Sequence, residues 1–238
     1  MPLSARVRFD ACADNPRQRQ TPREKYRMSD LEITHPQIYA YLEKTLTEET
    51  PLLREMGAYG RAQNFPIIGA QVGRLFYFLA RALKASQVLE LGSGFGYSAM
   101  WFALAVGAGG KVIMTEGKQA NVDRARDYFT RAGLLDRVEF NVGDALTRAE
   151  TYPGPFDIIF CDIDKHSYPQ ALALARAKLR VGGILIFDNM LWHGRILTEN
   201  DADTRAVLET TRALFDDNEF FTTLVPLHDG QALALRVK

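Results

Sequence analysis

From residue 87 onward, short apolar runs alternate with stretches that have helical periodicity. Each apolar run is continuous rather than alternating, as expected of a strand that is buried on both faces of a sheet. Strands are predicted at 87–91, 111–115, 137–141, 156–161 and 183–187, with helices at about 97–106, 118–132, 167–180 and 202–216. Because strand–helix repeats connect parallel strands, the pattern predicts an α/β domain with helices on both faces of a mostly parallel sheet.

The C-terminal end breaks this alternation. Two apolar runs, 220–227 and 231–237, are separated by His228-Asp229-Gly230. An Asp-Gly pair between two such runs is typical of a β-hairpin. The hairpin places one antiparallel strand in the otherwise parallel sheet.

The N-terminal part divides into a polar segment and a helical one. Residues 1–30 are rich in arginine and poor in large apolar side chains, which fits a mobile arm, a subunit-contact segment or a disordered tail. A helix is predicted from Pro36 to about Met56, and a second from Pro66, since proline favours the first helical turn. We therefore expect one domain over 31–238, with N-terminal helices at 31–85 and the sheet core at 86–238.

The composition excludes several classes of protein. The 29 basic and 29 acidic residues cancel, so there is no electrostatic case for binding to nucleic acid or to an anionic membrane. With only two cysteines, Cys12 and Cys161, the sequence argues against a disulfide framework or a zinc site. The apolar stretch 65–83 is interrupted by Arg74 and Arg81, which favours a core helix over a membrane span. The first residues lack the apolar core of a signal peptide. These absences lead us to expect a cytoplasmic enzyme.

Two predicted strands end in polar side chains. The strand 156–161 is followed by Asp162, Asp164 and Lys165, and the strand 183–187 by Asp188 and Asn189. Ligands of open α/β sheets bind outside the carboxyl ends of the strands, so these side chains are expected to meet there. Their oxygens suit Mg²⁺, Ca²⁺ or Mn²⁺, and a lysine beside them can serve as a base.

A glycine loop follows the first strand, at Gly92-Ser93-Gly94-Phe95-Gly96. Together with Glu116 at the end of the next strand, it predicts a nucleoside site, because a carboxylate there can bind both ribose hydroxyls. Tyr97 replaces the last glycine of the dinucleotide fingerprint, and Glu90 would repel a pyrophosphate. The cationic S-adenosylmethionine suits this acidic rim better than a nicotinamide dinucleotide does.

Together these residues resemble the cation-dependent class I O-methyltransferases, the family that contains the caffeoyl-CoA and catechol O-methyltransferases. The matching segments are Leu-Glu-Leu-Gly-Ser-Gly-Phe-Gly-Tyr-Ser at 89–98, Gly-Asp-Ala at 143–145, Phe-Asp-Ile-Ile-Phe-Cys-Asp-Ile-Asp-Lys at 156–165, Gly-Gly-Ile-Leu-Ile-Phe-Asp-Asn-Met-Leu-Trp-His-Gly at 182–194 and Pro-Leu-His-Asp-Gly at 226–230. They span about residues 60–238. The resemblance implies a Rossmann-like, seven-stranded, mostly parallel sheet with a reversed C-terminal strand, in agreement with the hairpin.

The resemblance also implies roles for individual residues. Asp162, Asp188 and Asn189 would bind one divalent cation, usually Mg²⁺, and Lys165 would be the catalytic residue. Trp192 and His193 would face the substrate, whereas we expect His35 and His228 to be structural. The residues that would contact the cofactor are Glu90, Gly92, Ser93, Ser98, Glu116, Ala145, Asp162 and Asp164. Members of the family are commonly homodimers.

The predicted function is a Mg²⁺-dependent O-methyltransferase that moves a methyl group from S-adenosylmethionine to a hydroxyl of a small catechol-like acceptor. Two alternatives stay open. One is an NAD(P)-dependent oxidoreductase on a Rossmann fold, and the other is a non-catalytic protein that binds S-adenosylmethionine. A phenylpropanoid ester, a flavonoid, a free catechol and a specialised metabolite are all compatible with the sequence as acceptor.

Overall fold

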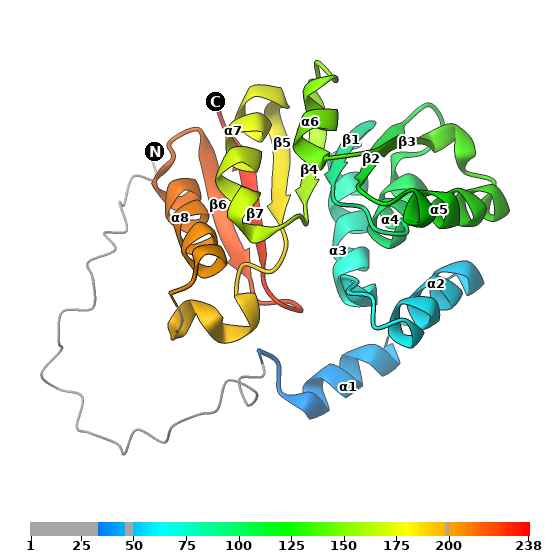
Figure 1. Ribbon diagram of the computed structural model, residues 1–238, viewed down its shortest axis with the longest axis horizontal. Coiled ribbons are helices and arrows are strands. Elements are labelled where there is room, and N and C mark those ends of the chain that lie inside the picture. The colour runs from blue at the N-terminus through cyan, green and yellow to red at the C-terminus, as the bar shows by residue number, and fades with distance from the viewer. Residues whose placement is uncertain (1–32, 46–49, 199) are drawn as a thin grey trace, which may run out of the picture.

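The computed structural model describes residues 33–45, 50–198 and 200–238 (Figure 1). The predicted N-terminal arm, 1–30, lies outside the described residues, and so does Cys12. The strands are β1 (Gln87–Leu91), β2 (Lys111–Glu116), β3 (Val138–Val142), β4 (Phe156–Cys161), β5 (Leu179–Phe187), β6 (Phe220–Val225) and β7 (Gln231–Arg236). The α-helices are α1 (Pro36–Thr45), α2 (Pro51–Ala62), α3 (Gly69–Ala82), α4 (Tyr97–Val106), α5 (Gln119–Ala132), α6 (Ala145–Glu150), α7 (Tyr168–Lys178) and α8 (Ala202–Asp216).

The described strands form one seven-stranded sheet in the order β3-β2-β1-β4-β5-β7-β6. The first five are parallel to one another, while β7 runs antiparallel to both of its neighbours, β5 and β6. The predicted fold, with its reversed C-terminal strand, is therefore confirmed. The strand order turns back after β1, which places β1 at the centre of the five parallel strands and its glycine loop in the middle of their carboxyl edge.

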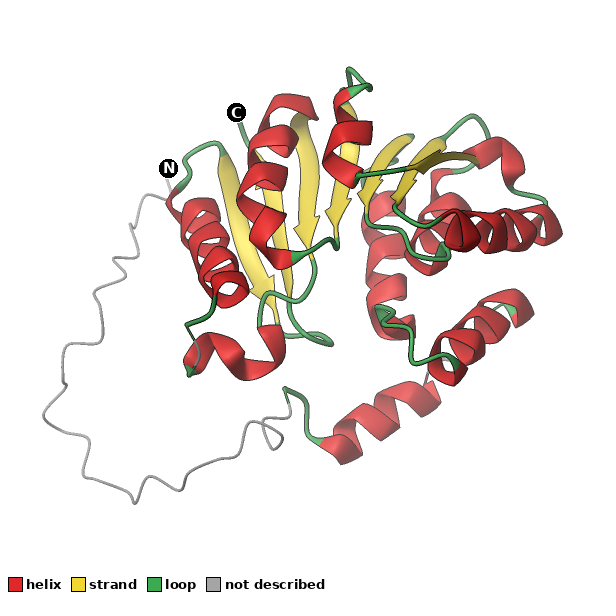
Figure 2. Ribbon diagram, viewed as in Figure 1, coloured by secondary structure: helices red, strands yellow, loops and turns green. Residues whose placement is uncertain are grey.

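Two apolar cores lie on the two faces of the sheet. Helices α3, α4 and α5 cover one face, and α6, α7 and α8 cover the other (Figure 2). On the first face the rings of Phe76 and Phe102 stack with centroids 5.0 Å apart, and Phe160 of β4 packs edge-on against Phe76. On the second face the fully buried Tyr168 packs on Phe187 of β5. The sheet is thus buried on both sides, as its continuous apolar strands predicted.

The N-terminal helices differ from the prediction. Instead of one helix from Pro36 to about Met56, there are two, because Thr50 caps a new helix: its side chain accepts a hydrogen bond from the Leu53 amide, and Pro51 opens the first turn. The helix predicted from Pro66 begins instead at Gly69, whose φ of +72° no helix can pass through. Residues 66–68 are left outside the helix, next to the edge of the sheet where the strands end.

Helix α3 occupies most of the apolar stretch 65–83, and it packs against α4. In the part of the chain that the structure describes, no helix is long and apolar enough to cross a membrane.

Candidate functional site

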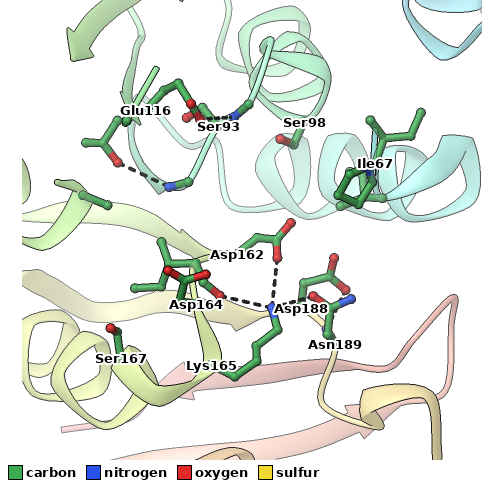
Figure 3. A pocket seen from close by; sticks show the side chains of 18 of the residues that line it. Ile67, Ser93, Ser98, Glu116, Asp162, Asp164, Lys165, Ser167, Asp188 and Asn189 are labelled. Atoms are coloured by element: carbon green, nitrogen blue, oxygen red, sulfur yellow. Dashed lines mark hydrogen bonds and ion pairs between the residues drawn. The ribbon is translucent and has the colours of Figure 1, made fainter. Parts of the chain in front are cut away.

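A pocket of about 640 Å³ opens at the carboxyl ends of β1, β2, β4 and β5 (Figure 3). This is the edge at which an open α/β sheet binds its ligands. The predicted site residues that line the pocket are Gly92, Ser93, Ser98, Glu116, Ala145, Asp162, Asp164, Lys165, Asp188, Asn189, Trp192 and His193. Of the predicted set, Glu90 alone does not line it.

The glycine loop has the conformation that its sequence requires. Gly92, Gly94 and Gly96 have φ values of +82°, +50° and +85°, in the left-handed region that favours glycine. A Cβ atom at Gly92 would lie 2.2 Å from the carbonyl oxygen of Asp162, closer than any side chain can come. The backbones of the loop after β1 and of the segment after β4 are therefore in direct contact.

Glu116 holds the glycine loop in place. Its Oε2 accepts a hydrogen bond from the Gly94 amide at 3.0 Å, and its Oε1 accepts from the Lys118 amide and the Asn121 side chain, both at 2.9 Å. The carboxylate is thus fixed at the tip of β2 beside the loop, as the sequence predicted.

Glu90 lies beneath the loop and is fully buried. Its Oε1 accepts a hydrogen bond from the Ser98 hydroxyl, and the Ser93 side chain also interacts with the carboxyl. Burial raises the pKa of this carboxyl to about 7, and the interactions with Ser98 and Ser93 oppose the rise. Its predicted contact with a cofactor stays a prediction.

Lys165 contacts side chains that follow both β4 and β5. Its Nζ lies 3.1 Å from Asp162 Oδ1 and 2.7 Å from Asn189 Oδ1, and it donates to the Tyr168 hydroxyl at 2.7 Å. The Tyr168 hydroxyl in turn donates to the carbonyl oxygen of Asp188 at 2.8 Å. Because Lys165 is only 6% exposed, these partners fix its amine at one point in the pocket wall.

Asp188 is a buried carboxylate that is 2% exposed. Its Oδ1 accepts hydrogen bonds from the Asn189 amide at 2.7 Å and from the side-chain amide of Gln231. Burial and the neighbouring Asp162 raise the pKa of its carboxyl to about 7.

The predicted metal ligands Asp162, Asp188 and Asn189 lie on adjacent strand ends around Lys165. They offer two carboxylates and one amide oxygen, a donor set that fits a hard divalent cation. Among the described residues there is no group of three or more histidine, cysteine, aspartate or glutamate side chains that could hold a metal ion. A cation here would therefore rely on the amide oxygen and on ligands from outside the protein, such as water or substrate.

The wall opposite the glycine loop is built from unusual backbone conformations. Asn189, Trp192, His193 and His228 all line the pocket, and all have φ between +47° and +55°. Non-glycine residues in this region are uncommon and tend to gather at functional sites. The buried Asp229 stabilises the arrangement, since its Oδ1 accepts a hydrogen bond from the His193 amide at 2.6 Å.

Sequence reasoning missed part of the pocket. His228, which we expected to be structural, lies in the wall, because the turn between β6 and β7 folds over the end of β5. The apolar segment 65–68, Ser167 and Asp203 also line it. Nothing in the local sequence marks these residues, and only the packing of distant segments brings them to the site.

Comparisons with known proteins agree with this geometry. The family model of the O-methyltransferases matches residues 42–237. A catechol O-methyltransferase of Mycobacterium tuberculosis is 34% identical over 87% of this chain and 98% of its own length. Caffeoyl-CoA O-methyltransferase 2 of Populus trichocarpa is 30% identical over 78% of this chain and 81% of its own.

A solved structure shares both fold and sequence with the chain. The O-methyltransferase TomG from Streptomyces achromogenes, involved in tomaymycin synthesis and solved in complex with SAM, superposes with a TM-score of 0.77. The match has 26% identity and covers 85% of this chain and 96% of that one. These findings confirm the family predicted from the strand-end motifs and count against the oxidoreductase alternative. The chain belongs to the O-methyltransferase family.

Proposed function

We propose that this O-methyltransferase moves the methyl group of S-adenosylmethionine to a hydroxyl of a small catechol-like acceptor, with Mg²⁺ bound beside it. The observation that carries the proposal is the group of oxygen donors from Asp162, Asp188 and Asn189 around the amine of Lys165, in the wall of the pocket. Catechol and caffeoyl-CoA are named as substrates of the relatives, and both names point to aromatic acceptors with neighbouring hydroxyls.

S-Adenosylmethionine would occupy the half of the pocket between the glycine loop and the β4 end. Glu116, Asp162 and Asp164 line this half, and the buried Glu90 lies below it. Such an acidic lining suits a ligand that carries both a sulfonium and an ammonium group. Ser93, Ser98 and Ala145 would complete the contacts, and the SAM complex of TomG supports this choice of cofactor.

The divalent cation would be held by Asp162, Asp188 and Asn189. When bound, Mg²⁺ supplies positive charge that favours the deprotonated form of an acceptor hydroxyl. A phenol has a pKa of about 10, so it is mostly protonated at neutral pH without such help. The protein's part is to set the position of the acceptor oxygen, because methyl transfer needs that oxygen in line with the sulfonium methyl.

In its neutral amine form, Lys165 would accept the proton of that hydroxyl. Its Nζ sits between Asp162 and Asn189, within the same group of oxygens that would hold the cation. The Tyr168 hydroxyl accepts a further hydrogen bond from Nζ, which helps to hold the amine in this position. Trp192 and His193, in the opposite wall, would hold the acceptor ring over this point.

We also propose a homodimer. Helix α1 has no buried residue, and the large apolar side chains of Ile38, Tyr41 and Phe78 are more than half exposed on α1 and α3. A second copy of the chain would cover this surface, as surfaces of this kind mark protein–protein contacts.

The proposal is tested by methyl transfer from labelled S-adenosylmethionine to a mixed panel of catechols, with Mg²⁺ and with EDTA. We expect incorporation only with Mg²⁺, and its loss in Asp188→Ala, because this change removes one of the two carboxylates. Asp216→Ala, which removes an exposed carboxylate at the end of α8, is the matched control and is expected to remain active. Equal incorporation with EDTA would remove the metal from the mechanism, and an active Asp188→Ala enzyme would remove Asp188 from the site.

A further inference from the structure

Gln231 is a fully buried polar residue at the start of the reversed strand β7, and its side-chain amide donates a hydrogen bond to Asp188 Oδ1. We propose that Gln231 is the positioning residue for the metal carboxylate: it orients Asp188 so that one oxygen is engaged by the protein and the other faces the cation. This inference rests on the proposed function, because it assumes that Asp188 is a ligand of the cation.

The sheet register explains how Gln231 reaches Asp188. Strands β5 and β7 are antiparallel, and Phe187 pairs with Ala232. One step further along the same register, Asp188 and Gln231 come opposite each other. Both are buried, at 2% and 0% exposure, so water has little access to their contact.

The two donors to Asp188 Oδ1 are both neutral. One is the backbone amide of Asn189 at 2.7 Å, and the other is the Gln231 side chain. The cationic Lys165 bonds instead to Asp162 and Asn189. A buried carboxylate needs hydrogen-bond donors to stay ionised, and a neutral donor adds no positive charge beside it. An amide supplies the hydrogen bond and leaves the negative charge for the cation.

Gln231 is also poorly suited to a purely structural role. Its Oε1 is buried and has no hydrogen-bond partner among the described residues. A buried acceptor without a donor lowers stability, and an apolar side chain of similar size would avoid this cost. A residue that fixes the orientation of a metal ligand is expected to matter for metal affinity instead.

The test is a titration with Mn²⁺, in which free Mn²⁺ is followed by its electron paramagnetic resonance signal without an acceptor. Gln231→Met keeps the length and volume of the side chain but removes the donor. We expect Mn²⁺ affinity to fall by about 10-fold or more, in the range seen when outer-shell partners of metal ligands are removed. Affinity for S-adenosylhomocysteine and the melting temperature should not fall. Gln119→Met makes the same change at an exposed position on α5 and should bind Mn²⁺ like the parent protein.

Each outcome has a distinct meaning. If the parent protein binds no Mn²⁺, the proposed function fails before the inference is reached. If the parent binds Mn²⁺ and Gln231→Met binds it equally well, the positioning role is refuted. Parallel losses of Mn²⁺ binding, S-adenosylhomocysteine binding and melting temperature would show a structural role instead. Should Gln231→Met fail to fold, Gln231→Asn decides, because it keeps an amide that is one methylene too short to reach Asp188.

Discussion

The buried Glu90 makes a prediction about the pH dependence of stability. Its carboxyl is fully buried below the glycine loop, and burial raises its pKa from 4.5 to about 7. In the unfolded chain the group releases its proton near its ordinary pKa, whereas the folded protein holds the proton up to about pH 7. Between these values the folded state binds more protons, so stability falls as the pH rises. Glu90→Gln removes this loss, because glutamine keeps an oxygen for the Ser98 hydroxyl and carries no charge at any pH.

The size of the effect follows from the shift. One pKa unit corresponds to about 1.4 kcal/mol, so the rise from 4.5 to about 7 amounts to about 3 kcal/mol across the full range. Most of it, about 2–3 kcal/mol, falls between about pH 5 and pH 8.5. In a protein of this size, 1 kcal/mol corresponds to about 2–4 °C in melting temperature, so the variant should gain about 4–12 °C on the wild type across this interval.

The assay is urea unfolding of the ligand-free wild type and of Glu90→Gln at several pH values across this interval. Only the difference between the two proteins is interpreted, because Asp188 contributes a slope of the same sign to both. Glu209→Gln, on the exposed face of α8, controls for the loss of one charge from the molecule. A difference between Glu90→Gln and wild type that stays constant with pH would refute the reasoning, since it would mean that Glu90 ionises alike in the folded and unfolded states.

Two further predictions concern catalysis. Lys165→Met should lower kcat by about 100-fold or more, the range for loss of a general base, and leave the affinity for S-adenosylhomocysteine unchanged; an equal loss of both, measured by steady-state kinetics and calorimetry, would indicate a structural lysine. Gly230→Ala should raise KM for the acceptor without changing S-adenosylhomocysteine affinity, because its Cβ would lie 2.5 Å from Leu191 Cγ and displace the segment that carries Trp192. Gly109→Ala has the same left-handed φ but meets no atom within 4 Å, so a comparable rise in KM there would show that backbone strain alone is responsible.

The central part of the fold followed from the sequence because its signals are local. A short apolar run such as 156–161 indicates a buried strand, and Asp229-Gly230 marks the turn between the last two strands without help from the rest of the chain. The boundaries of the N-terminal helices were not predicted correctly, because they depend on single residues inside a stretch whose apolar pattern is helical throughout. Thr50 begins α2 with a side-chain cap, and Gly69 begins α3 with a positive φ.

The candidate site was predictable where its residues directly follow strands. Parallel strands end at one edge, so Asp162 and Asp188 had to lie near each other once both strands were assigned. The contacts of Lys165 with Tyr168 could not be foreseen in the same way, although the two are only three residues apart. They depend on how the short helical turn at Lys165–Ser167 leads into α7.

The reversed strand β7 explains why the remaining site residues were not predicted from the sequence. Each parallel strand brings its carboxyl end to the pocket, so motif reading looks for functional residues just after strands. Because β7 is antiparallel to β5, it brings its amino end to the same edge instead. The residues that matter there precede the strand or begin it: His228 in the wall, Asp229 on the His193 amide and Gln231 on Asp188. A search at the amino end of an antiparallel strand, beside a strand that ends in an aspartate, would have found all three.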